Sequence, residues 1–386
     1  AVLDVFHNYM QQKECHLLEP VSRDPKCAVV YFSAEYGLHR SLPFYAGGLG
    51  FLAGDYIKEC IDLCLPLVAV GFMYPEGYLR QQIRDDGWQE NLVESINREA
   101  APISKVMGKD GRQLVIKVPL TDPPIYVALW TVAVGRVSLY LMDTDVEIND
   151  PWNRGITARL YTGDLEQRLR QEIVLGLGGA EVLKALGIDH YLLHLNEGHA
   201  AFALLERIRA TVSAGKNLAA ACEKNINTTI FRTHTPVAAG HDVFPFQLIE
   251  KYFHSYWPDL GLDRDAFFQL GIHPEKSGAG FNMTAFALRL SGYRNAVSKR
   301  HAEVSRKIWQ SLWPDVPQDQ VPIDYVTNGV HVPTWIEPKI KLLLDKYLGA
   351  DWLDEHDDPA VWQLLDNVPD TELWQTHHWL KVKLID

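Results

Sequence analysis

Two histidines follow apolar runs that predict buried strands, and a histidine at such a place can take part in chemistry. His199 stands in "LHLNEGHAAF" and His234 in "FRTHTPV", where Pro236 favours an extended turn. The carboxyl ends of parallel strands are the usual place for ligands in α/β proteins. A neutral imidazole there can hydrogen-bond a ligand hydroxyl. We therefore expect His199 and His234 to face one cleft, with a packed or capping histidine as the alternative at each position.

A second signal is the glycine-rich stretch "YAGGLGFLAGD", which lies between the predicted strand "CAVVYFSAEY" and a helix predicted from Phe51 to Leu63. Without Cβ atoms, the backbone lets peptide N–H groups approach an anion, and the helix dipole adds a favourable field. We expect Gly47, Gly48 and the N–H of Leu49 to face a phosphate or a sugar. The same letters also occur in ordinary tight turns, so this loop alone leaves both interpretations open.

The order of the predicted elements indicates an α/β fold with a parallel sheet. The strand before the glycines, the helix after them and the run "PLVAVGF" form a strand–helix–strand unit. A β-rich insert follows, and helix–strand alternation resumes at Asp164. The insert consists of "GRQLVIKVPL", "PIYVALWTV" and "GRVSLYLMD", and the later elements are a long helix from Asp164 to Ile188, the strand "HYLLHL", a helix from Gly198 and the strand "NTTIFRT". The glycines of "LGLGG" in the long helix predict close helix contact rather than phosphate binding.

A second long helix is predicted from Met283 to Ile308. Apolar residues recur along this segment at a spacing of four and three, and Arg294 and His301 occupy two of the intervening apolar slots. The apolar residues are Met283, Ala287, Leu290, Val297, Val304 and Ile308. The pattern predicts one helix with two polar residues on its buried face.

Composition limits the class of protein. A chain of 386 residues suits one large α/β unit or two domains, and its formal net charge of -12 disfavours binding to a nucleic-acid backbone. The longest uncharged apolar run, residues 64–74, has about half the length that a membrane-spanning helix needs. We expect no nucleic-acid or membrane partner and a cytoplasmic location. Five cysteines without a zinc-type pair predict reduced thiols and no metal site.

Several ordered motifs together resemble the α-glucan (glycogen, starch or maltodextrin) phosphorylases. They are "VVYFSAEYGLHRSL", "AGGLGFLAGD", "LHLNEGHAAF", "FRTHTPV", "NAVSKRHAEVSR" and "VTNGVHVPTW". The resemblance implies a GT-B glycosyltransferase, in which residues 1–345 form an N-terminal Rossmann-like domain with a β-rich insert. Residues 346–386 would lead to a C-terminal domain, outside this chain, that holds pyridoxal phosphate. Such enzymes act in carbohydrate metabolism, where inorganic phosphate removes the terminal glucose of an α-1,4-glucan or maltooligosaccharide as glucose 1-phosphate.

The resemblance also implies roles for particular residues. The His199 imidazole would bond a sugar hydroxyl while its carbonyl faces the anomeric carbon, and the loop at Gly48 would act in catalysis. "ARLYTGD" resembles the family's gating loop, and Gly47 and Gly48 would also lie near the cofactor phosphate. The residues expected to bind substrate are Gly47, Gly48, Leu49, Tyr161, Asp164, Arg168, Asn196, His199 and His234.

The chain also departs from the family pattern. The Schiff-base lysine of the family stands in a motif rich in glycine, serine and threonine, and no such motif occurs here. We therefore expect the chain to be the N-terminal half of the enzyme and to be inactive alone, with a homo-oligomer as a further expectation. Gly37 and the sequence "NEGHAA" also differ from better-known members, although Asn196 and His199 keep the family spacing.

Three alternatives remain open from the sequence. A starch or glycogen synthase carries a lysine-bearing GGLG loop, where this chain has Tyr45 and Ala46. A free-standing glucan-binding domain would keep a sugar groove and lack catalysis. A glycosidase would need two carboxylates about 5 to 10 Å apart, and Glu35, Asp55 and Glu197 are the candidates. For Glu35 we expect a structural pairing with Arg40 or another cation instead.

Overall fold

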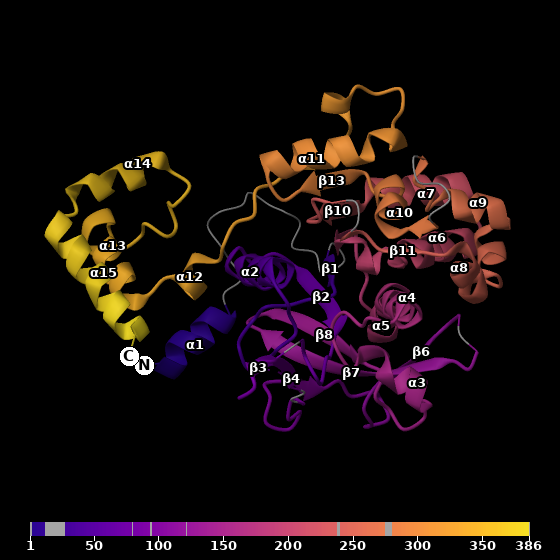
Figure 1. Ribbon diagram of the computed structural model, residues 1–386, viewed down its shortest axis with the longest axis horizontal. Coiled ribbons are helices and arrows are strands. Elements are labelled where there is room, and N and C mark those ends of the chain that lie inside the picture. Colours follow the sequence, from indigo (N-terminus) through magenta and orange to yellow (C-terminus); the bar gives the residue numbers. More distant parts are fainter. Residues whose placement is uncertain are drawn as a thin grey trace. The chain divides into compact units, whose positions relative to one another are not determined.

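The computed structural model of the chain describes residues 2–11, 28–78, 80–92, 95–120, 122–237, 240–274 and 280–385 (Figure 1). The chain folds into two compact units, residues 1–329 and 330–386. The junction predicted at residues 346–386 lies within the second unit, and its connection to a further domain stays a prediction.

The first unit is built on a ten-stranded mixed sheet, which confirms the α/β class. The strand order is β14-β13-β10-β9-β1-β2-β8-β7-β5, with β6 paired to β7. Neighbours from β14 to β8 are parallel, whereas β5, β6 and β8 each pair antiparallel with β7. The strands are β1 Val29–Ser33, β2 Leu67–Phe72, β5 Ser104–Lys105, β6 Val115–Val118, β7 Ile125–Val134, β8 Val137–Asp143, β9 Leu192–Asn196, β10 Thr229–Thr233, β13 Tyr293–Ala296 and β14 Asp324–Tyr325. The predicted β-rich insert thus extends one edge of the sheet.

Helices cover both faces of the central strands. Tyr31 and Phe32 are neighbours in β1 and point to opposite faces. Tyr31 packs against Tyr56 of α2, with ring centroids 4.8 Å apart, and Phe32 lies against Gly179 at the start of α5. The helices of this unit are α1 Val2–Gln11, α2 Gly48–Asp62, α3 Pro151–Arg154, α4 Leu165–Ile173, α5 Gly179–Leu186, α6 Ala203–Ser213, α7 Leu218–Asn227, α8 Phe246–Phe253, α9 Arg264–Gln269, α10 Met283–Arg289 and α11 Lys299–Trp309. Two further sheets have two antiparallel strands each. One pairs β3 Arg80–Ile83 with β4 Gln89–Leu92, and the other pairs β11 Val243–Phe244 with β12 Phe281–Asn282.

The long helix predicted from Asp164 is confirmed as α4 and α5, joined by a π-helical turn at Val174–Gly178. The predicted role of its glycines is also confirmed. A Cβ atom on Gly176 would lie 2.7 Å from the Phe202 Cβ and from the Ala203 nitrogen. Glycine at this position therefore allows the helix to approach the chain that follows β9.

The long helix predicted from Met283 to Ile308 is wrong. In the structure α10 ends at Arg289, β13 pairs with β10, and α11 begins at Lys299. A Cβ atom on Gly292 would lie 3.1 Å from the Ile226 carbonyl carbon, so the chain turns tightly there before entering the sheet. The apolar spacing that suggested one helix arises from two short helices and a strand that share one core.

The prediction of reduced thiols is wrong for Cys64. Cys60 is buried in α2 as a free thiol, and Cys222 is also free. Cys64 follows the end of α2 with a φ of 54° and is disulfide-bonded. Cys15 and Cys27 lie outside the described residues. Among the described helices, none has the length and apolar content needed to cross a membrane.

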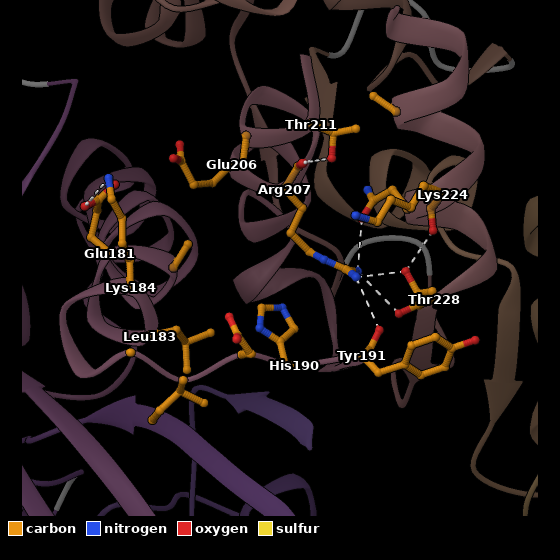
Figure 2. Close-up of a pocket in the computed structure, with 17 residues that line it drawn as sticks. Glu181, Leu183, Lys184, His190, Tyr191, Glu206, Arg207, Thr211, Lys224 and Thr228 are labelled. Carbon is orange, nitrogen blue, oxygen red and sulfur yellow. Dashed lines mark hydrogen bonds and ion pairs between the residues drawn. The ribbon is translucent and has the colours of Figure 1, made fainter. Parts of the chain in front are cut away.

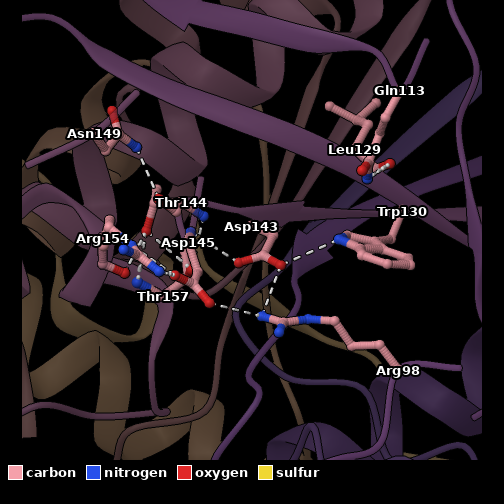
Figure 3. Close-up of polar contacts among 10 residues, drawn as sticks. All are labelled: Arg98, Gln113, Leu129, Trp130, Asp143, Thr144, Asp145, Asn149, Arg154 and Thr157. Carbon is pink, nitrogen blue, oxygen red and sulfur yellow. Dashed lines mark hydrogen bonds and ion pairs between the residues drawn. The ribbon is translucent and has the colours of Figure 1, made fainter. Parts of the chain in front are cut away.

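A polar network fixes the end of β8, the last strand of the insert (Figure 3). Asp143 is buried and accepts hydrogen bonds from Arg98 Nη2 at 2.9 Å and from Trp130 Nε1 at 3.1 Å. Asp145 accepts from Arg154 Nε at 2.8 Å. Because a buried carboxylate is costly without partners, these bonds are what allow Asp143 at this position.

The second unit is a small helical cluster. Its core contains the buried side chains of Leu348, Trp352 and Val361. Glu372 ties two of the helices, because it accepts from Lys346 Nζ at 2.9 Å and from the Tyr347 hydroxyl at 2.6 Å. The helices are α12 Val332–Trp335, α13 Pro338–Leu348, α14 Pro359–Gln363 and α15 Asp370–Ile385.

Candidate active site

The topology brings the predicted site residues to one edge of the sheet. Strands β1, β9 and β10 are adjacent and parallel, and Ser33, Asn196 and Arg232 lie in register near their carboxyl ends. The segments that leave this edge carry Glu35, His199 and His234, as predicted from the strand patterns.

Glu35 anchors the glycine loop to the next segment of the site. Its carboxylate is buried and accepts from Ala46 N at 2.8 Å, from Gly47 N at 3.3 Å and from the Tyr161 hydroxyl. The prediction that Glu35 pairs with Arg40 or another cation is therefore wrong. Its partners are peptide N–H groups and the phenol of Tyr161. The N–H of Gly47, expected to face a ligand, is committed to Glu35.

The glycines around the start of α2 divide into open and packed positions. A Cβ atom on Gly47 or Gly48 would meet nothing within 4 Å. On Gly50 it would lie 2.5 Å from the Tyr45 Cβ, and on Gly54 it would lie 2.7 Å from the carbonyl carbon of Gly37. Within the described part of the chain, the N–H groups of Gly48 and Leu49 have no recorded acceptor, as is usual in the first turn of a helix. These two N–H groups are the donors open to an anion.

Tyr161, Arg168 and His199 come together beside this loop. The Arg168 guanidinium lies over the Tyr161 ring at 4.6 Å, and the Tyr161 and His199 ring centroids are 5.9 Å apart. Arg168 Nη2 donates to Asp242 Oδ2 at 2.9 Å, and His199 Nε2 lies 3.6 Å from the same oxygen. Sequence reasoning missed Asp242, which lies far along the chain in "GHDVF" without a motif signal.

The electrostatics of this cluster favour a neutral His199. Burial lowers the pKa of His199, and Arg168 lowers it further. Burial alone would raise the pKa of Asp242, but Arg168 and His199 outweigh burial, so the net direction is downward. The site therefore presents a carboxylate, a guanidinium and an uncharged imidazole at neutral pH.

Asn196 and His234 form a second pair at the same edge. His234 Nε2 lies 2.7 Å from Asn196 Oδ1, and Asn196 Nδ2 donates to Ser33 Oγ at 3.0 Å. Burial lowers the pKa of His234 to about 4, although Glu197 opposes the shift. Neutral His234 therefore donates to Asn196 and fixes the amide.

Glu197 is held by the backbone around it. Its carboxylate accepts from Thr235 N at 2.8 Å, from Gly198 N and Thr233 Oγ1 at 3.3 Å, and from His234 N. With these donors in place, Glu197 is a structural anchor, which disfavours the glycosidase alternative.

Two of the predicted contacts have other surroundings. Asp164 is exposed and caps α4, because its Oδ1 accepts from Gln167 N at 2.7 Å. Leu49 lies in the first turn of α2 and is half-buried. The structure thus brings Tyr161, Arg168 and His199 into contact, and it places Asp164 at a helix start.

A cavity of about 780 Å³ lies at the opposite edge of the sheet, near the amino ends of β9 and β10 (Figure 2). Arg207 is central to its polar lining and donates to neutral acceptors, including Thr228 Oγ1 at 2.8 Å and Asn225 Oδ1 at 3.1 Å. Lys184 lies 3.5 Å from Glu181. None of the residues predicted to bind a ligand lines this cavity, so we place the candidate site at the carboxyl edge.

Several curated relatives of this chain carry phosphorylase names, although no protein-family model matches it. It is 46% identical over 361 residues to glycogen phosphorylase from Aquifex aeolicus, which covers 94% of this chain and 52% of the relative. It is 43% identical over 387 residues to maltodextrin phosphorylase from Thermococcus litoralis, covering 100% and 46%. A glycogen phosphorylase from Mycobacterium tuberculosis is 40% identical over 371 residues, covering 93% and 42%.

The chain spans about half the length of the curated relatives it matches. The matched regions cover between 93% and 100% of this chain. The resemblance predicted from the motifs is therefore confirmed: over nearly its whole length this chain is similar to about half of each of these glycogen and maltodextrin phosphorylases.

Proposed function

We propose that this chain supplies one half of the active site of an α-glucan phosphorylase. The observation that carries the proposal is the contact of Tyr161, Arg168 and His199 beside a helix start whose Gly48 and Leu49 N–H groups are open. The printed names of the relatives support glucan and phosphate as substrates. A synthase is not favoured, because the relatives at 40–46% identity are named phosphorylases.

Each group has a defined part in the proposed reaction. The neutral imidazole of His199 binds a sugar hydroxyl, and the Asn196–His234 pair is a second set of polar contacts at the same edge. The Gly48 and Leu49 N–H groups stabilise negative charge, since donors fixed before the reaction need no reorganisation. Tyr161, held by Glu35, packs over Arg168 and borders the sugar.

We further propose pyridoxal phosphate as the cofactor, held mainly by residues outside this chain in a GT-B arrangement. This chain offers the Gly48 and Leu49 N–H groups at the start of α2, where a Cβ atom added to Gly48 would meet nothing within 4 Å and an anionic group fits. When bound, the cofactor supplies a phosphate group for proton exchange. The cytoplasmic location and the homo-oligomer stay predictions.

The test measures glucose 1-phosphate release from maltodextrin and inorganic phosphate. We expect no release by this chain alone, and release by the product of the gene that encodes it. In that product, Gly48→Val should lower turnover sharply with little loss of folding, because its Cβ branches meet only the space that the anion uses. Gly47→Ala is the matched control for loop flexibility.

Robust release by the chain alone would overturn the proposed division between two halves. Unchanged turnover of Gly48→Val would refute the role of the loop. Absence of release by the gene product, together with maltooligosaccharide binding by this chain, would favour the glucan-binding domain instead.

A further inference from the structure

Two buried glutamates near the site have opposite surroundings. Glu172 of α4 is 2% exposed and Glu197 is 3% exposed. Glu197 accepts from several N–H and O–H donors. Among the described residues, neither carboxyl oxygen of Glu172 accepts from a hydrogen-bond donor, and the nearest cation atom, Arg168 Nε, lies 3.6 Å away. A carboxylate without donors is costly to bury, so Glu172 needs another way to be accommodated.

One cation serves two carboxyl groups in this cluster. Arg168 Nη2 is committed to Asp242 at 2.9 Å, while its Nε faces Glu172 without forming a hydrogen bond. His199 Nε2 lies 3.6 Å from the Asp242 oxygen that Arg168 also contacts. We propose that Glu172 holds a proton at neutral pH, and that Asp242, left as the single carboxylate beside Arg168, is the positioning residue of His199. The role of Asp242 rests on the proposed function of His199.

The surroundings shift the pKa values of Glu172 and Asp242 in opposite directions. Burial raises the pKa of Glu172 well above its usual range, and Asp242 raises it further, whereas Arg168 opposes the shift and Glu197 adds to it. The pKa of Asp242 moves the other way, because Arg168 and His199 together outweigh its burial. Two neighbouring carboxyl groups whose pKa values separate in this way retain one proton between them.

The protonated Glu172 explains how His199 is oriented. With Glu172 uncharged, Asp242 is the carboxylate that contacts both the Arg168 guanidinium and the Nε2 side of the imidazole. His199 Nδ1 is buried and has no partner among the described residues, so the proton of the neutral ring belongs on Nε2, facing Asp242.

A cavity of about 10 Å³ borders Arg168, Glu172 and His199. Its size is near the lower limit for one water molecule, which would need about 10–15 Å³. A water that donated to Glu172 would favour an ionised carboxylate. The experiment below distinguishes that state from the protonated one.

The first test compares the pH dependence of unfolding in this chain and its variants. Protonated Glu172 ionises on unfolding above pH 4.5, its ordinary pKa. The unfolding constant of the wild type should then rise about tenfold per pH unit, from pH 5.5 to 7, relative to Glu172→Gln. Glutamine resembles the neutral acid, so this variant should fold.

Glu197→Gln is the matched control, since it changes an equally buried glutamate that already has donors. The Glu197→Gln variant should have a larger unfolding constant than the wild type at all these pH values. The ratio of the two constants should not change tenfold per pH unit. An equal pH slope for the wild type and Glu172→Gln would overturn the proposal, because Glu172 would then be ionised in the folded chain.

The second test reads the His199 ring by NMR of histidine-labelled chain, assigned with His199→Gln. The wild type and Glu172→Gln should both show a neutral ring protonated on Nε2, and Asp242→Asn should shift the tautomer toward Nδ1. An unchanged tautomer in folded Asp242→Asn would refute the positioning role. If Asp242→Asn does not fold, a tautomer altered by Glu172→Gln would refute it. Neither measurement uses glucan or phosphate, so failure here is separate from failure of the proposed function.

Discussion

The glycines of α2 allow a direct test of which backbone positions are packed and which are open. A Cβ atom on Gly54 would lie 2.7 Å from the carbonyl carbon of Gly37 and closer still to its oxygen. Both obstacles are main-chain atoms, which no side-chain rotation can remove, so the overpacking cost should be about 3 kcal/mol. Alanine regains about 1 kcal/mol through its helix propensity. We expect Gly54→Ala to lower the free energy of unfolding by about 2 kcal/mol.

Gly48→Ala is the matched control, because a Cβ atom there meets nothing within 4 Å. Its free energy of unfolding should stay within about 0.5 kcal/mol of the wild type. Urea unfolding of this chain at pH 7, followed by circular dichroism, measures both variants. Equal stability of the two variants would refute the division into packed and open glycines, and so would a large loss in Gly48→Ala alone.

Three further measurements probe the surroundings of the site. Asp143→Ala leaves Arg98 without its buried partner and should cost about 3 kcal/mol in urea unfolding; a loss below about 1 kcal/mol would contradict this. Glu35→Gln should cost about 2 kcal/mol and speed amide exchange in the glycine loop, and a double-mutant cycle with Tyr161→Phe should show coupling rather than additivity. Burial lowers the pKa of His190 from 6.5 to about 4. The stability that comes from the neutral buried imidazole is therefore complete above pH 6.5, the pKa in the unfolded chain, and is lost as the pH falls. His190→Gln should therefore reduce the loss of stability between pH 7 and 5 by about 2 kcal/mol, and an unchanged loss would refute it.

Much of the fold follows from short-range patterns. The buried strands β1 and β2 are continuous apolar runs bounded by turn residues, which is typical of parallel strands covered on both faces, whereas β9 and β10 also carry the polar residues His194 and Arg232. The prediction of one helix from Met283 to Ile308 was wrong because the helical spacing of apolar residues continues across a strand only four residues long. That strand is set by pairing with β10, a long-range contact that no local window contains.

The candidate site was predictable only in part, for a similar reason. His199 and His234 follow strands, so strand order alone places them at one edge. Asp242 and Glu172 carry no such signal, and each acquires its importance from a contact made after folding. Glu172 in particular reads as one charged residue of an amphipathic helix until its burial is known.

Asp164 can act at the site either as a cap or as a ligand contact, and its position allows the two to be separated. It lies at the start of α4, the helix that carries Arg168, and its Oδ1 accepts from Gln167 N at 2.7 Å. As a cap it stabilises that helix, so Asp164→Ala should cost about 1 kcal/mol, whereas Asp164→Asn should retain most of the stability because asparagine caps about as well. Maltooligosaccharide affinity of this chain, measured by calorimetry, should then be equal in the wild type and Asp164→Asn. A large loss of affinity in Asp164→Asn, with stability retained, would instead show that the carboxylate itself binds the sugar.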